Sequence, residues 1–294
     1  MDNITEKQNS KSEKLNQLNS LNILNLINDE DSKITSSIKK NIPKINLLIR
    51  DIIKKMKNNG RLFYVGCGTS GRLGVLDASE CPPTFGVSKD TVQGLIAGGD
   101  LALKESVENA EDSLIDGLKI VKEKKLNKDD TIIGISASGS AKYVHGALEE
   151  AKKRGATTAM ISCNNINNRK YFDHLIVVIL GPEVITGSTR MKAGTATKMI
   201  LNMISTTVMI KLGHVYNNLM VDLKLKNKKL FNRALNIIMK IAEVDIEVAK
   251  KSLSDSKGNI KVAIVISKFG KGFHEADKLL KENNNSLDRI LKRK

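Results

Sequence analysis

The chain has few residues of the types that build metal sites. Among its 294 residues there are three cysteines and four histidines. Cys67, Cys81 and Cys163 show no C-x-x-C spacing, and the histidines are spread from His145 to His274. These counts and spacings argue against a metal site. Cysteines without a pairing pattern are typical of a reducing compartment, so we expect a cytoplasmic protein.

Long apolar stretches are also missing. No apolar run approaches ~18 residues, the length at which a membrane-spanning helix is expected. The N-terminus, MDNITEKQN, is polar and lacks the apolar core of a signal peptide. The sequence therefore predicts no membrane association.

Aromatic residues are scarce, while positive charge is abundant. Aromatics make up 3% of the chain and there is no Trp, so stacking platforms for nucleic-acid bases are few. The net charge of +16 comes from lysines scattered through every segment and not from a patch. We expect no nucleic-acid partner. A diffuse positive field would instead attract a small molecule that carries phosphate and carboxylate groups.

Three regions follow one another along the chain. Residues 12–57 show apolar residues at helical spacing, with Pro43 as an expected break, and the Asn-Asn-Gly at 58–60 stops this region. Strand and helix patterns alternate from residue 61 to about 213. Lys- and Leu-rich helices dominate from about 217 onward, where the run 262–266 is ambiguous between strand and helix. We therefore divide the chain into an N-terminal helical region (1–57), a central domain (58–216) and a C-terminal helical region (217–294).

The central domain has five apolar runs that read as buried strands, with helical stretches between most of them. Such strands predict a five-stranded parallel sheet covered by helices on both faces, an α/β fold in three layers. The expected strands are residues 62–65, 92–97, 131–136, 157–162 and 175–180.

The most informative stretch is residues 61–86. An apolar run ends in the glycine-rich sequence GCGTSG at 66–71, and a helical run begins there. Backbone N–H groups and the positive end of the helix dipole at such a loop suit an anion. The letters also match the dinucleotide fingerprint. However, Thr69 and Ser70 place hydroxyls where a pyrophosphate loop needs bare backbone, so we favour a single terminal phosphate, as on a sugar phosphate.

Hydroxyl groups also follow two other expected strands. Ligands of an open parallel sheet bind at the carboxyl ends of its strands. Ser and Thr are preferred helix caps, so capping alone could account for any one of these loops. Three such loops together favour a phosphate or sugar pocket. The predicted binding residues are Gly68, Thr69, Ser70, Ser136, Ser138, Ser140, Ser188, Thr189 and Arg190.

Two carboxylates stand out as candidates for catalysis. Glu80 precedes Cys-Pro-Pro at 81–83, which we expect to be a rigid turn that fixes its direction. Glu111 falls on the apolar stripe of a helix expected over 103–121. A buried carboxylate is costly unless it is paired or protonated, and this suits proton transfer. A salt bridge or helix cap is the alternative for Glu111. We interpret Glu108 and Asp112 as solvated charges and Asp77 as a cap or loop organiser.

Long motifs spread over nearly the whole chain make it resemble the N-acetylmuramic acid 6-phosphate etherases, bacterial enzymes of cell-wall sugar recycling built on a sugar isomerase (SIS) domain. These motifs are GTSGRLG at 68–74, DASECPPT at 77–84, GLIAGG at 94–99, Glu-Asp at 111–112, GPEVITGSTRMKAGT at 181–195 and NLMVD at 218–222. The resemblance implies an SIS phosphosugar-binding domain over 58–216. It also implies a lyase that acts in peptidoglycan recycling and amino sugar metabolism. Together with the amphipathic N-terminal region, it predicts a homodimer.

The resemblance implies a reaction that needs no metal and no nicotinamide cofactor. The substrate's D-lactyl ether is eliminated from the open-chain aldehyde, and water adds at C3 to give N-acetylglucosamine 6-phosphate and D-lactate. Glu80 and Glu111 are implied as the two active-site carboxylates. We assign Glu80 as the acid for the departing lactate and Glu111 as the base at C2, and the opposite assignment stays open.

The sequence departs from the family pattern in one of the expected binding loops. The family usually continues Arg-Thr-Pro-Tyr after residues 137–139. This chain has Ser140, Ala141, Lys142 and Tyr143. Ser140 can supply the hydroxyl that Ala141 lacks.

Two other functions fit the same fold. One is an aldose–ketose phosphosugar isomerase, which would move a proton between C1 and C2 without releasing lactate. The other is a non-catalytic phosphosugar-binding regulator that resembles the glucokinase regulatory protein. The presence of both Glu80 and Glu111 argues against a pure sensor.

Overall fold

The computed structural model of the chain describes residues 3–167, 170–225 and 227–292. The chain divides into two compact units: Met1–Ser79 with Lys89–Ser205, and Glu80–Ser88 with Thr206–Lys294. The outer ends of the polar N-terminus and of the C-terminal region, residues 1–2 and 293–294, lie outside the described residues.

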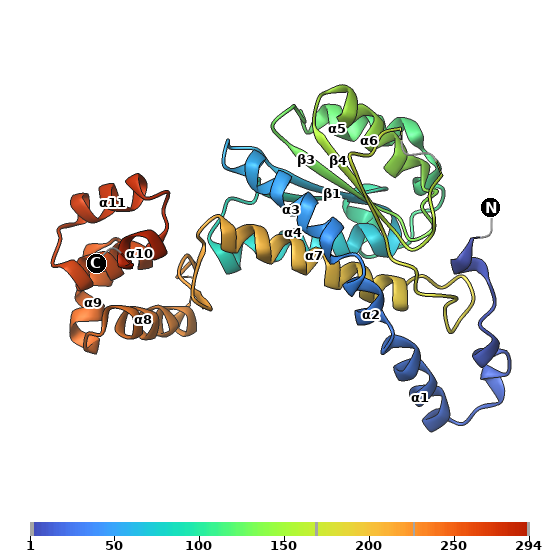
Figure 1. Cartoon of the computed structure of the whole chain (residues 1–294), viewed down its shortest axis with the longest axis horizontal. Coiled ribbons are helices and arrows are strands. Elements are labelled where there is room, and N and C mark those ends of the chain that lie inside the picture. The colour runs from blue at the N-terminus through green and yellow to red at the C-terminus, as the bar shows by residue number, and fades with distance from the viewer. Residues whose placement is uncertain (1–2, 168–169, 226, 293–294) are drawn as a thin grey trace. The chain divides into compact units, whose positions relative to one another are not determined.

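A five-stranded parallel sheet forms the centre of the first unit (Figure 1). Its strand order is β2-β1-β3-β4-β5, and Gly66 at the end of β1 pairs with the last residues of both β2 and β3. The carboxyl ends of these three strands therefore meet at one edge. The sheet confirms the predicted fold class. The strand bounds are β1 Leu62–Gly66, β2 Val92–Ile96, β3 Thr131–Ile135, β4 Thr157–Ser162 and β5 His174–Val177.

Helices cover both faces of this sheet (Figure 1). Alternate residues of a strand point to opposite faces, and β1 shows this directly. Phe63 and Val65 are buried in a cluster with residues of α6 (Lys142–Lys153), which packs beside α5 (Leu114–Glu123). Tyr64 points the other way and donates a hydrogen bond to Asp77 on α4 (Gly68–Phe85). The long helix α7 (Lys192–Lys211) packs beside α4 on that side.

Three helices precede the sheet: α1 (Ser20–Asp31), α2 (Ile34–Lys39) and α3 (Ile42–Met56). Short 3₁₀ turns at Ile4–Glu6, Ser10–Ser12 and Leu15–Gln17 lead into them. The expected break at Pro43 is the start of α3, where proline fits because the first turn needs no N–H donor. The buried isoleucines and leucine of α3 form its inward face.

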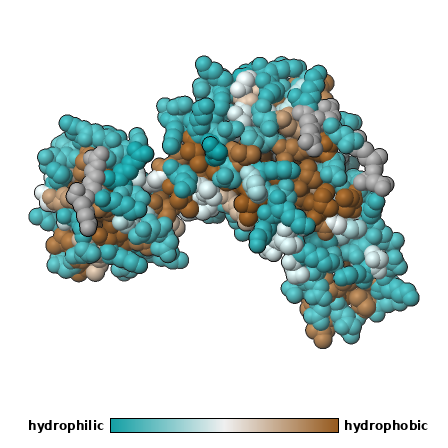
Figure 2. Space-filling model, in the orientation of Figure 1, coloured by the Kyte–Doolittle hydropathy of each residue, from teal (hydrophilic) through white to brown (hydrophobic). Residues whose placement is uncertain are grey.

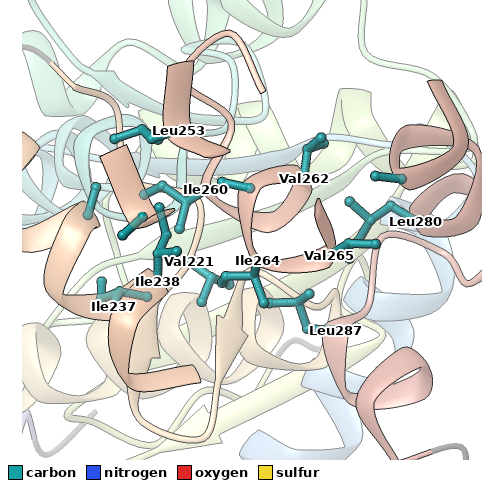
Figure 3. Packing of buried hydrophobic residues seen from close by; sticks show 14 of the residues in the cluster. Val221, Ile237, Ile238, Leu253, Ile260, Val262, Ile264, Val265, Leu280 and Leu287 are labelled. Carbon is teal, nitrogen blue, oxygen red and sulfur yellow. The ribbon is translucent and has the colours of Figure 1, made fainter. Parts of the chain in front are cut away.

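The second unit is mainly helical and has its own core (Figure 3). The run 262–266 lies within α10 (Ile260–Phe269), and its residues 262–265 are buried because α8, α9 and α11 pack against this helix. A two-stranded hairpin formed by β6 (Val215–Tyr216) and β7 (Leu219–Met220) precedes these helices, and the sequence did not predict it. The helix bounds are α8 Lys228–Ala242, α9 Ile246–Asp255, α10 Ile260–Phe269, α11 Phe273–Glu282 and α12 Leu287–Leu291. Within the described ranges, no helix combines the length and apolar character needed to cross a membrane.

Candidate active site

The predicted phosphate loop is the first turn of α4. Gly68 has a φ of +49°, a left-handed conformation that favours glycine. The strand and helix approach so closely that a Cβ on Gly66 would lie 2.7 Å from the backbone N of Gly71. Thr69 and Ser70 are half-buried beside this turn. The first N–H groups of α4 and two hydroxyls therefore lie at the carboxyl edge of the sheet, an arrangement that suits an anion.

The serine loop, residues 136–140, follows β3 at the same edge. Its hydroxyls form a chain in which Ser138 Oγ lies 3.3 Å from Ser136 Oγ and 2.8 Å from Ser140 Oγ. The structure thus brings the three predicted serines together. At the start of α6, the N-cap residue Ala141 makes no side-chain cap bond. A ligand oxygen can therefore accept from the first N–H groups of this helix.

The loop before α7 reaches the first turn of α4. A Cβ on Gly194 would lie 3.5 Å from Thr69 Cγ2 and 3.6 Å from the carbonyl oxygen of Thr189. Thr69 and Thr189 therefore lie close to each other, on either side of Gly194. Ser188 is half-buried and Arg190 is exposed on the same loop.

Glu183 and Lys192 support this third loop, and neither was predicted from the sequence. The Glu183 carboxylate accepts hydrogen bonds from the backbone N of Lys192 and of Ala193, at 3.0 and 2.9 Å, and so caps α7. Burial raises the pKa of Glu183 above its ordinary value, although these two bonds oppose the shift. The position of Glu183 before a helical run was the signal available in the sequence.

A buried ion pair joins the same loop to the N-terminal helices. Lys192 Nζ lies 2.6 Å from Glu30 Oε2 on α1 and also donates to the carbonyl oxygens of Leu180 and Pro182. Burial alone would raise the pKa of Glu30. Hydrogen bonds and charges from Lys192 and Lys33 outweigh burial and lower this pKa from 4.5 to about 2. Lys192 and Glu30 lie 162 positions apart in the chain, so no local sequence pattern marks this pair.

The helix expected over 103–121 is wrong, and with it the buried position of Glu111. The segment forms 3₁₀ turns at Gly99–Leu103 and Ala110–Asp112, and α5 begins only at Leu114. Asn109 adopts a φ of +58°, which a helix cannot contain, and the Ser113 side chain caps α5. Glu111 is exposed and not on a buried apolar stripe.

Glu111 nevertheless lies at the carboxyl edge of the sheet. Burial, followed by the negative charges of Glu111 and Asp112, raises the pKa of the Cys67 thiol to about 12. Cys67, which joins β1 to α4, and Ala110, the neighbour of Glu111, pack against the same apolar cluster, so the turn that carries Glu111 lies near the first turn of α4. Asp112 forms an ion pair of 3.4 Å with Lys142, the first residue of α6. The 3₁₀ turn that carries Glu111 therefore lies near the first turn of α4 and near the start of α6.

The rigid turn expected after Glu80 is also wrong. The helix α4 continues through Pro82 and Pro83 to Phe85. The disruption by two prolines is limited because the helix ends within one turn, where Gly86 N donates to Pro82 O at 3.0 Å. Glu80 is exposed and belongs to the second unit, whereas the three hydroxyl-bearing loops and Glu111 belong to the first.

Asp77 organises the helices behind the site. Its buried carboxylate accepts hydrogen bonds from Tyr64 Oη (3.0 Å), Asn202 Nδ2 (2.6 Å) and Ser205 Oγ (3.1 Å). These donors come from β1 and α7, so Asp77 joins the sheet and two helices. It is an organiser as expected, although it lies inside a helix and not at a cap or in a loop.

Curated relatives match the chain from end to end. A protein of Clostridium botulinum is 49% identical, with 99% of this chain and 98% of the relative covered. Proteins of Clostridium acetobutylicum (48%; 99% and 97% covered) and Bacillus subtilis (45%; 98% and 95% covered) are similarly close. All three are called N-acetylmuramic acid 6-phosphate etherase. This chain belongs to that family.

Two family models and a solved structure agree with the fold of this etherase-family chain. Residues 44–152 match the N-terminal SIS domain of glucokinase regulatory protein, and residues 217–262 match the C-terminal lid domain of the same protein. A phosphoheptose isomerase from Francisella tularensis has a TM-score of 0.50 at 16% identity, covering 66% of this chain and 100% of that one. This likeness concerns the fold alone.

Proposed function

We propose that this chain cleaves the D-lactyl ether of N-acetylmuramic acid 6-phosphate to give N-acetylglucosamine 6-phosphate and D-lactate. The observation that carries the proposal is the 45–49% identity to curated etherases over nearly the whole chain. The hydroxyl-lined edge of the SIS sheet is consistent with a phosphorylated sugar as the ligand.

In this proposal the first turn of α4 and the serine loop hold the 6-phosphate. The hydroxyls of Thr69, Ser70 and Ser138 are placed where two helices begin, and backbone N–H groups there add further donors. Thr189 approaches Thr69 from the loop before α7 and extends the same polar surface. Ser188 and Arg190 on that loop are candidates for contacts to the sugar.

The proposed chemistry uses two carboxyl groups in opposite protonation states. Glu111 removes the proton from C2 of the open-chain aldehyde, and the electron pair forms a C2–C3 double bond. The C3–oxygen bond breaks, and Glu80 donates a proton to the departing lactate oxygen. Water then adds at C3 while C2 regains a proton. The nearness of Glu111 to the first turn of α4 supports its part, and the DASECPPT motif supports that of Glu80.

We also propose that the protein is a cytoplasmic homodimer that serves peptidoglycan recycling. The N-terminal helices support the dimer because α1 exposes Leu21 and Leu24 and α3 exposes Leu47, each more than half accessible. Figure 2 shows hydrophobic surface over α1 at the lower right of the view. Sedimentation should give twice the chain mass, and L21E/L24E should shift the equilibrium toward monomer. A wild-type monomer at micromolar concentration would contradict the dimer.

A direct assay tests the proposed activity. The protein is incubated with N-acetylmuramic acid 6-phosphate, and D-lactate is measured with a coupled dehydrogenase. One D-lactate should appear for each N-acetylglucosamine 6-phosphate formed, and unphosphorylated N-acetylmuramic acid should react poorly. Absence of lactate with formation of a sugar isomer would favour the isomerase alternative and overturn the proposal.

A further inference from the structure

A buried ion pair in the second unit is centred on Asp222, which follows β7. Asp222 Oδ2 lies 2.5 Å from Lys261 Nζ on α10 and 2.8 Å from His214 Nδ1, just beyond α7. The Lys261 side chain is only 5% exposed. A buried lysine without a counter-charge strongly destabilises the folded state. The Asp222 carboxylate is therefore needed beside Lys261.

The backbone of Asp222 also lies against the end of α4. Gly86 has a φ of +70°, and a Cβ there would lie 2.1 Å from the carbonyl oxygen of Asp222. Any larger residue at position 86 would push the two segments apart. The neighbouring Phe85 is buried. The last residues of α4 are therefore held in close contact with Asp222.

The core of the second unit holds the backbone of Asp222 in this contact with Gly86. Val221, the neighbour of Asp222, is fully buried in the cluster that includes Ile238 and Ile264 (Figure 3). A cavity of about 560 Å³ borders Asp222, Lys261 and Gly86, so packing alone does not hold the carboxylate in place. The ion pair to Lys261 does.

We infer that Asp222 is a positioning residue for Glu80. Glu80 lies six residues before Gly86, on the helix whose end Asp222 holds, and residues 80–88 group with the C-terminal region. The C-terminal helices thereby fix the direction of the Glu80 carboxyl group. This inference rests on the proposed role of Glu80 as the acid that protonates the departing lactate.

Kinetics of D222N provide the first test. The substitution keeps the size of the side chain and removes its charge, which leaves the Lys261 ammonium buried without a counter-charge. We expect kcat for lactate release to fall about 10- to 100-fold, since small displacements of a catalytic group cost this much. KM should stay within about twofold, because the proposed phosphate-holding loops belong to the first unit. E247Q, which removes an exposed partner of Lys250, is the matched control and should leave both constants unchanged.

Amide hydrogen exchange provides the second test and needs no activity. Peptides that cover residues 80–88 should exchange faster in D222N than in the wild type, while those covering β1 should not change. H214Q removes only one bond to Asp222. It should change kcat and the exchange of residues 80–88 in the same direction as D222N but to a smaller extent, and it replaces D222N in both tests if D222N does not fold. The double variant D222N/K261M removes both charges and should recover part of kcat and of the protection.

The outcomes separate this inference from the proposed function. An active wild type whose D222N variant keeps the normal kcat, or keeps normal exchange over 80–88, overturns the positioning role. A wild type that releases no lactate overturns the proposed function. The hydrogen-exchange comparison then tests by itself whether Asp222 holds residues 80–88.

Discussion

At the scale of single residues, the two proposed catalytic carboxylates act from exposed positions. Glu80 lies near the end of a helix and Glu111 in a 3₁₀ turn near the start of α6. Their contribution therefore depends on where the bound sugar places its C2 proton and its departing oxygen.

Replacing either carboxylate by its amide should abolish proton transfer without altering the fold. We expect E80Q and E111Q each to reduce lactate release by at least ~100-fold, the usual cost of losing a general acid or base. Both side chains are exposed, so the melting temperature should stay close to that of the wild type. E108Q, an exposed carboxylate three residues before Glu111, is the control and should keep full activity. Near-normal turnover in E80Q or E111Q would remove that residue from the mechanism.

At the scale of elements, the first turn of α4 is the proposed anchor for the phosphate. S70A should weaken binding of N-acetylglucosamine 6-phosphate by about 1–3 kcal/mol, the range for a hydrogen bond to a charged group. Calorimetry with the wild type and S70A measures the difference. Unphosphorylated N-acetylglucosamine should bind poorly to both proteins. Equal affinity of the wild type for the two sugars would contradict a phosphate pocket.

The Glu30–Lys192 pair joins α1 to the loop before α7 and makes the stability of the folded state depend on pH. The pKa of Glu30 is about 2 in the folded chain and 4.5 ordinarily, so its ionised form favours folding. That stabilisation is complete above about pH 4.5 and is lost as the pH falls toward about 2. Chemical unfolding at several pH values should show the loss of stability in this window.

The variant K192M should isolate this contribution. It leaves Glu30 buried without its main partner, so we expect destabilisation of about 3–5 kcal/mol at neutral pH. Its stability should also depend less on pH between 4.5 and 2 than that of the wild type. K119M, which removes an exposed ion pair with Asp116, should change stability by less than about 1 kcal/mol. A pH dependence in K192M equal to that of the wild type would refute the role of the pair.

At the scale of the whole molecule, the parallel sheet was predictable because its strands are continuous apolar runs. The helix predicted around Glu111 does not form, because Asn109 takes a left-handed conformation and Ser113 caps the next helix. Two consecutive prolines also failed to end α4 where the sequence suggested. The serine hydroxyls were predictable from their place after β3. The ion pairs of Lys192 and Lys261 were not, because each joins segments far apart in the chain.

Labelled water tests the central claim, an elimination followed by water addition. N-acetylmuramic acid 6-phosphate is converted in deuterium oxide and, separately, in ¹⁸O-water, and both products are analysed by mass spectrometry. The account predicts solvent deuterium at C2 and ¹⁸O at C3 of the sugar phosphate, with lactate free of ¹⁸O from the cleaved ether. A C3 label without deuterium at C2, or ¹⁸O in that position of lactate, would contradict elimination through the two carboxylates.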